Sequence, residues 1–110
     1  MEGLVSFGNK RNYDDFKKQI PIPVQPLFDL IRNTCLSFGK NVVEDVRMHR
    51  IVFGKSLTFR WFADVEPQND RIIIKIQKDR KEAPQIIDIK LGQDVTELKE
   101  ILKNAYETIR

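Results

Sequence analysis

The stretch Leu-Thr-Phe-Arg-Trp-Phe-Ala-Asp-Val, residues 57–65, decides the fold. Apolar side chains recur in it at every second position, and alternate side chains of a β-strand point to opposite faces of a sheet. We therefore expect a strand whose odd-numbered side chains, from Leu57 to Val65, face the core. Arg60 and Phe62 would then face away from the core.

Before this strand the apolar pattern also has a period of two. Val46 and Met48 alternate with polar residues, and residues 50–53 lead to Gly54-Lys55-Ser56. That tripeptide is typical of a turn that folds one strand back on the next. We expect a hairpin at this point.

Two more strands are expected after it. Residues 67–70 are turn formers, and the charged residues 78–82 predict a solvated loop between the two strands. The side chains expected to face inward are Ile72, Ile74, Ile76, Ile87, Ile89 and Leu91. Those expected to face outward include Arg71, Ile73, Lys75, Ile86 and Lys90.

A helix is expected on each side of the strands. The first follows the prolines of residues 21–26, because a proline in the first helical turn costs little, and it ends at Gly39, which favours a left-handed stop. Its apolar residues recur at three- and four-residue steps. The last helix begins at Asp94, which has the spacing of a capping box with Glu97.

The expected fold is an α+β two-layer sandwich with the order helix, four or five strands, helix. Because the connections between strands are short, the strands should form an antiparallel meander, and both helices should cover one apolar face. We divide the chain into a partly ordered N-terminal tail, residues 1–20, and a single domain, residues 21–110. In the tail, Tyr13, Phe16 and Ile20 share one face of a helical turn.

The composition is that of a globular protein with one core. The chain has 110 residues, of which 41% are hydrophobic and 32% are charged. No apolar run approaches the ~20 residues that a bilayer span needs, and the first twenty residues lack the apolar stretch of a signal peptide. We therefore expect a cytoplasmic protein that does not bind membranes. The net charge of +3 attracts phosphate only where basic side chains gather on one face.

The single cysteine and the single histidine limit the chemistry. Cys35 and His49 cannot form an internal disulfide or a Cys/His zinc cluster, and Cys35 lies on the apolar side of the first expected helix. Asp88-Ile89-Lys90 matches the D-x-K element of restriction-type nucleases, but the same spacing recurs at three other places in the chain. We expect no catalytic residues, no metal and no cofactor.

The expected open face of the sheet is the natural place for a binding site. It would combine basic side chains with one exposed aromatic ring, Phe62, as single-stranded nucleic-acid binders do. Asp64 and Asp88 would lie on the same face and could pair with these cations instead. A second basic group, around the first hairpin, includes Arg47 and His49. The candidate binding residues are Arg60, Phe62, Lys75, Lys90, Arg71, Arg50 and Lys55.

Several short motifs resemble a small uncharacterised domain family. They are Leu27-Phe28-Asp29-Leu30, Leu36-Ser37-Phe38-Gly39, Val43-Glu44-Asp45-Val46, residues 50–59, and Leu98 to Tyr106. Members of this family occur alone or appended to proteins with a restriction-endonuclease-like domain, some labelled as predicted transport proteins. The resemblance covers residues 20–110 and implies a fold similar in outline to frataxin-like sandwiches. It implies no catalytic residues.

These observations favour a non-catalytic binding module. It would contact nucleic acid, or a nuclease-like partner that processes nucleic acid, through the open sheet face and the first hairpin. We expect a monomer or a weak homodimer that associates through its last strand. The alternative function is a small-molecule or metal-responsive domain with a pocket beneath Trp61, between the sheet and the helices.

Overall fold

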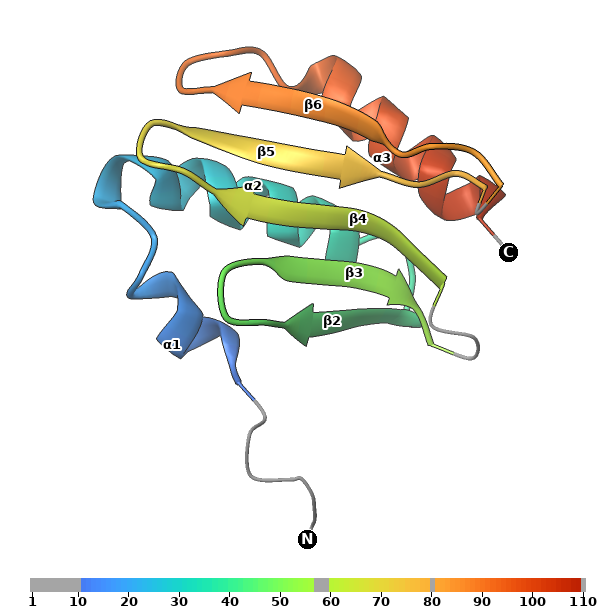
Figure 1. The fold of residues 1–110 in the computed structure, drawn as a ribbon, viewed down its shortest axis with the longest axis horizontal. Helices are drawn as coiled ribbons and strands as arrows, with labels where there is room; N and C mark the ends of the chain where they lie inside the picture. The colour runs from blue at the N-terminus through green and yellow to red at the C-terminus, as the bar shows by residue number, and fades with distance from the viewer. Residues whose placement is uncertain (1–10, 57–59, 80, 110) are drawn as a thin grey trace, which may run out of the picture.

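The protein folds as a five-stranded sheet with its helices on one side (Figure 1). The computed structural model describes residues 11–56, 60–79 and 81–109. The helical segments in these ranges are α1 (Tyr13–Lys17), the 3-10 turn η1 (Ile22–Val24), α2 (Gln25–Leu36) and α3 (Thr96–Thr108). The strands are β2 (Val42–Val46), β3 (Ile51–Lys55), β4 (Arg60–Pro67), β5 (Arg71–Ile76) and β6 (Gln85–Lys90).

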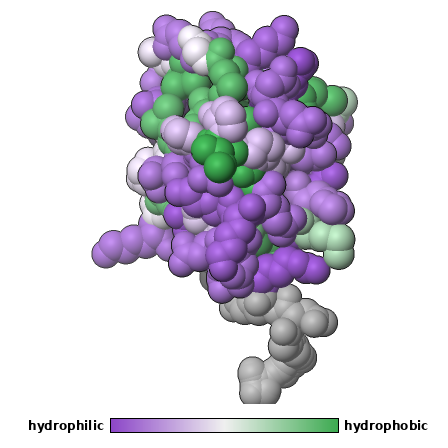
Figure 2. Space-filling view, turned by 90° about the vertical axis from the view of Figure 1, so that its left-hand side faces the viewer, coloured by the Kyte–Doolittle hydropathy of each residue, from purple (hydrophilic) through white to green (hydrophobic). Residues whose placement is uncertain are grey.

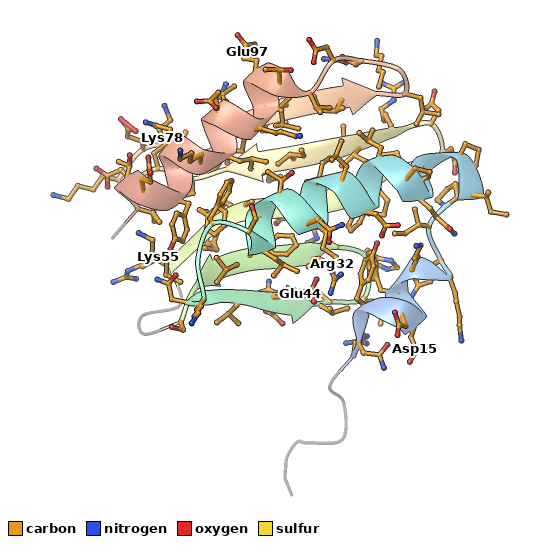
Figure 3. The ribbon with its side chains drawn as sticks, turned by 180° about the vertical axis from the view of Figure 1, so that it is seen from behind. Asp15, Arg32, Glu44, Lys55, Lys78 and Glu97 are labelled. Carbon is orange, nitrogen blue, oxygen red and sulfur yellow. The ribbon has the colours of Figure 1, made fainter. Side chains whose placement is uncertain are left out.

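The strands lie in chain order, β2-β3-β4-β5-β6, and each is antiparallel to the next. Helices α2 and α3 lie behind the sheet in Figure 1 and in front of it in Figure 3, so they cover the same face. The predicted α+β sandwich with a meander sheet is therefore confirmed. No described helix covers the opposite face, which we call the open face.

The core lies between the sheet and the two long helices. Its helical side chains include Phe28, Ile31 and Cys35 from α2 and Leu98, Leu102 and Ala105 from α3. Its strand side chains are Ile51, Phe53, Phe62, Ala63, Val65, Ile72, Ile74, Ile76 and Ile89. The isoleucines of β5 and β6 that were expected to face inward do so. Leu91, in contrast, lies beyond the end of β6 and is 41% exposed.

The short helix α1 packs against this core. Asn12 begins it, since the Asn12 side chain accepts a hydrogen bond from the Asp15 amide at 2.8 Å. The rings of Tyr13 and Phe16 lie against Phe28 of α2, with centroids 6.1 Å and 5.7 Å from it. The described part of the N-terminal segment is therefore integral to the domain.

A network of charged and polar side chains ties α1 to α2 and β2. Tyr13 Oη and Lys17 Nζ both donate to the carboxylate of Asp29, the lysine at 2.7 Å. The guanidinium of Arg32 lies 4.0 Å from the centroid of the Tyr13 ring. Arg32 also donates two hydrogen bonds to Glu44 of β2, and Figure 3 shows these two side chains pointing toward each other.

This network makes part of the stability depend on pH. Partial burial alone would raise the pKa of Asp29, but the hydrogen bonds from Lys17 and Tyr13 outweigh it and hold that pKa below the ordinary 3.8. A lowered folded-state pKa adds stability above the unfolded value, and this stability is lost as the pH falls through the folded value. The free energy of unfolding, measured with urea at a series of pH values, should therefore fall less steeply at acid pH in Asp29→Asn than in the unchanged protein. Asp14→Asn, at an exposed position in α1, is the matched control, and a fall at acid pH as steep in Asp29→Asn as in the unchanged protein would contradict this role of Asp29.

Gly39 is required for space rather than for an unusual backbone angle. Among the described glycines only Gly92 has a positive φ, of 80°, so the predicted left-handed stop at Gly39 is wrong. A Cβ atom at Gly39 would collide with Tyr106 Oη, which donates a hydrogen bond to Asn41 Oδ1 at 2.6 Å. The glycine lets this link between α3 and the start of β2 form.

Gly39→Ala should therefore lower the free energy of unfolding by about 1–2 kcal/mol, because it breaks the Tyr106–Asn41 bond and displaces the ring. Thermal or urea unfolding measures this cost. In a Tyr106→Phe background the same alanine should cost less, because the colliding hydroxyl is gone. Equal costs in the two backgrounds would contradict this explanation.

A bulge in β4 reverses the predicted orientation of two aromatic residues. Ala63 lies opposite Phe53 of β3, and Trp61 lies opposite the next residue, Gly54, so Phe62 is one residue too many on β4. A bulge places two residues opposite one and shifts the alternation of side chains along the strand. The prediction that Trp61 faces inward and Phe62 outward is wrong for this reason.

Phe62 is buried instead under the ends of the two long helices. It has no exposed surface, and its ring centroid lies 6.2 Å from that of Phe38 and 5.5 Å from that of Tyr106. Leu57 and Phe59, which were also expected to face inward, lie outside the described residues.

Arg60 was also predicted on the open face, and it too lies on the helix side. Its register partner is Lys55, whose Nζ donates to the carbonyl oxygen of Ile109 at 2.9 Å and lies 4.8 Å from the Tyr106 ring centroid. Directly opposite residues share a face, so Arg60 points the same way. Lys55 therefore lies at the carbonyl end of α3, where a helix carries partial negative charge.

Two local predictions also need correction. The hairpin expected at Gly54-Lys55-Ser56 does join two antiparallel strands, although Gly54 and Lys55 belong to β3 itself. A further hairpin that was not predicted turns at residues 47–50, where the Arg47 amide donates to the Arg50 carbonyl at 2.8 Å, so Met48 belongs to a turn and not to a strand. The capping box of α3 does not form with Asp94 as the residue before the helix. Asp94 accepts instead from the amide and the hydroxyl of Thr96, at 3.0 Å and 2.8 Å.

Candidate functional site

The open face is formed by alternate side chains of all five strands, together with Arg50 at the start of β3. Its composition follows from the register, because residues paired across strands share a face. The side chains on it are Val43, Asp45, Arg50, Val52, Trp61, Asp64, Glu66, Arg71, Ile73, Lys75, Ile86, Asp88 and Lys90. Four of these are carboxylates and four are cations, so the described face has no net charge.

Arg50, in the turn before β3, links two carboxylates of β4. Its Nη1 lies 3.3 Å from Asp64 and its Nη2 lies 3.2 Å from Glu66. The side chains of Arg50, Asp64 and Glu66 are 34%, 15% and 32% exposed, so the cluster is partly shielded from water. Arg50 was a candidate phosphate ligand, but its guanidinium is already engaged by two protein carboxylates.

Arg71 forms a second cluster toward β6. Its guanidinium lies 2.9 Å from Asp88 and 3.1 Å from Asp70. The hydrogen bond from Arg71 lowers the pKa of Asp70, and the bonds to Asp70 and Asp88 raise the pKa of Arg71. Arg71 is therefore paired as well. Lys75 and Lys90 form no ion pair within the described part of the chain.

An apolar row crosses the face from β2 to β4. Val43 lies opposite Gly54, and Gly54 lies opposite Trp61, so no side chain stands between the valine and the indole along this row. Trp61 is half-buried. Val52, in the next row, is only 3% exposed although it is not part of the helix-side core. Ile86, at the far edge, is 64% exposed.

The structure brings together four of the seven candidate residues on the open face: Arg50, Arg71, Lys75 and Lys90. Arg60, Phe62 and Lys55 lie on the helix side, so the predicted stacking platform is absent from the face. Trp61 takes that place instead. The signal that could have revealed it is Gly54 in the neighbouring strand, since a large aromatic residue often packs over a cross-strand glycine.

The predicted pocket beneath Trp61 does not agree with this geometry, because Trp61 points away from the helices. Cys35 is fully buried, and burial raises the pKa of its thiol, which suits a packing residue and not a nucleophile. Within residues 11–56, 60–79 and 81–109, no group of three or more histidine, cysteine, aspartate or glutamate side chains is arranged to hold a metal ion.

Comparison with known proteins finds no relative. No family model matches the chain, and no curated protein and no solved structure matches it. Among the described helices, none has the length and apolar character needed to cross a lipid bilayer.

Proposed function

We propose that this chain is a non-catalytic binding domain that docks a partner protein on the open face of its sheet, around Trp61. The observation behind the proposal is that this face, which no described helix covers, holds a half-buried indole next to apolar side chains and internally paired charges. Protein interfaces commonly centre on an aromatic side chain within a polar rim. Arg50 and Arg71, each paired with carboxylates, would form such a rim.

Nucleic acid is the second candidate occupant. Lys75 and Lys90 favour it, because both stand on the open face without an ion pair among the described residues. Four carboxylates on the same face disfavour it, since they repel phosphate and three of them already hold Arg50 and Arg71. A protein surface, which can bury Trp61 and pair with both signs of charge, is the better match.

Photo-crosslinking in the cells that produce the protein tests the proposal. A benzophenone side chain is placed at Ile73 on the open face or, as the matched control, at Lys99 on the exposed side of α3. We expect one discrete adduct from position 73 and none from position 99. The partner identified by mass spectrometry is then purified, and its affinity is measured by calorimetry.

In that measurement Trp61→Ala should weaken binding by roughly 30-fold, as expected for the central aromatic of an interface, and Lys99→Ala should leave it unchanged. Equal affinity for the two variants would contradict the proposal. Anisotropy with single-stranded and duplex oligonucleotides supplies the second arm. Tight binding that weakens steeply with salt would replace the protein partner by nucleic acid.

A further inference from the structure

Among the described residues, no strand pairs with the outer side of β6. This strand is the last of the sheet, so β5 bonds it on one side only (Figure 1). An unpaired strand edge is a template for pairing with another chain, and proteins often protect such edges with prolines, bulges or short strands. β6 is six residues long and regular from Gln85 to Lys90.

The hydrogen bonds around Arg71 and Lys90 decide which groups of β6 point outward. The carbonyl oxygen of Arg71 accepts from the Gln68 amide at 2.8 Å, on the β4 side, so Arg71 does not bond its register partner Lys90. Lys90 bonds Gln93 instead. Its amide donates to Gln93 Oε1 at 3.1 Å, and its carbonyl accepts from the Gln93 amide at 3.2 Å.

Along an antiparallel strand the direction of the backbone groups alternates from residue to residue. Ile86 and Asp88 therefore point outward with Lys90, whereas Ile87 and Ile89 point toward β5. The outward groups of Lys90 are already taken by Gln93. Within the described residues, two amides and two carbonyls remain unpaired on this edge, those of Ile86 and Asp88.

We propose that β6 pairs with β6 of a second copy of this chain, antiparallel, with Ile87 on the two-fold axis. In this register Ile86 lies opposite Asp88 of the second copy, and Asp88 lies opposite its Ile86. Each of these two pairs exchanges two hydrogen bonds, so all the free groups of both edges are satisfied. Two five-stranded sheets become one continuous sheet.

The neighbouring registers fit less well. Both helix layers stay on the same side of the joined sheet only if helix-side residues of one copy lie opposite helix-side residues of the other. Alternative registers therefore differ by steps of two residues. One such register places Asp88 directly opposite Asp88 of the second copy, where two like charges meet, and calls on Lys90 groups that Gln93 holds. The other places Asp88 opposite Pro84, which has no N–H to donate.

The ends of β6 fit the chosen register. Pro84, which lacks an N–H, would lie opposite Lys90 of the second copy, whose own backbone groups are occupied. Ile86, which is 64% exposed, would lie beside the second copy, and Asp88 keeps its ion pair with Arg71 at 2.9 Å. The pairing uses the edge of the sheet and does not depend on the partner proposed for the open face.

Cysteine crosslinking tests both the dimer and its register. Residues on the two-fold axis in a non-hydrogen-bonded pair have Cα atoms roughly 4.5 Å apart, within the range that a disulfide bridges. Mild oxidation of Ile87→Cys should therefore convert most of the chain into a covalent dimer on a non-reducing gel. Gln85→Cys is the control, because its two copies would lie about 13 Å apart. It carries the same Cys35, so it also controls for that thiol.

Sedimentation of the unmodified chain and of Ile86→Pro is the second measurement. A proline at position 86 removes only an outward N–H, so the monomer keeps its bonds to β5, and circular dichroism should show an unchanged fold. The dimer loses two of its four new hydrogen bonds, and its dissociation constant should rise roughly tenfold or more. A chain that stays monomeric up to the highest soluble concentration, or equal crosslinking at positions 85 and 87, would overturn the proposal.

Discussion

Replacing Phe62 with alanine should remove a large part of the stability of this protein, whereas the same change at its neighbour Trp61 should be mild. Phe62 is fully buried between the rings of Phe38 and Tyr106, and Phe→Ala changes in such sites cost about 3–5 kcal/mol. Trp61 stands on the open face, where losing a cross-strand contact costs about 1 kcal/mol. Typical domains have only about 5–15 kcal/mol to lose.

The measurement is urea unfolding followed by far-ultraviolet circular dichroism, because Trp61→Ala removes the single tryptophan and with it the fluorescence signal. Phe62→Leu is the second variant. It keeps an apolar side chain and should fold with a smaller loss than Phe62→Ala, so a value remains available if the alanine variant does not fold. A larger loss from Trp61→Ala than from Phe62→Ala would show that the bulge in β4 is wrong.

The second large effect is expected at Phe16. Its ring is 2% exposed and packs on Phe28, so Phe16→Ala should cost about 3 kcal/mol and release α1 from the helix α2. Limited proteolysis with trypsin reports the release, because Lys17 and Lys18 lie in and directly after α1. Cleavage there should become much faster.

Asp14→Ala is the matched control for this experiment. Asp14 is an exposed residue of the same short helix, and substitutions at such positions usually change stability by less than about 0.5 kcal/mol. If Phe16→Ala left both the unfolding midpoint and the trypsin cleavage unchanged, α1 would not be part of the domain. The ionic network of Tyr13, Asp29 and Arg32 would then have no role in holding it.

The layers of the fold follow from the sequence because hydrophobic periodicity reports which element a segment forms. The regular alternation of Ile72, Ile74 and Ile76 placed β5 correctly, and the apolar steps along α2 and α3 placed both helices. These signals come from many residues, so one exception does not change the result.

The prediction of the candidate site depended on fewer residues than the prediction of the fold, and it was less accurate. The orientation of β4 rested on strict alternation through Trp61 and Phe62, and a single extra residue in the bulge exchanged their faces. A bulge is decided by how the neighbouring strand pairs, in this case Phe53 and Gly54 against Trp61 and Ala63. The period of one strand does not contain that information.

Charge pairing was also only partly visible in the sequence. Asp64 and Asp88 were expected on the open face beside the cations, and both are there. Which cation each would take depends on the register. Arg50 pairs with Asp64, and Arg71 pairs with Asp88. The face is neutral where a basic surface was expected, because Arg60 lies on the helix side while Asp45 and Glu66 stand on the open face.

The ring contacts of Trp61 and Phe62 show which face of the sheet each side chain occupies. Nuclear Overhauser effects in the native protein measure them. The structure predicts strong effects between the ring protons of Phe62 and those of Tyr106 and Phe38, and none between the Trp61 indole and these rings. Effects from the Trp61 indole to Tyr106, with Phe62 free of such contacts, would contradict the bulge and with it the open face described above.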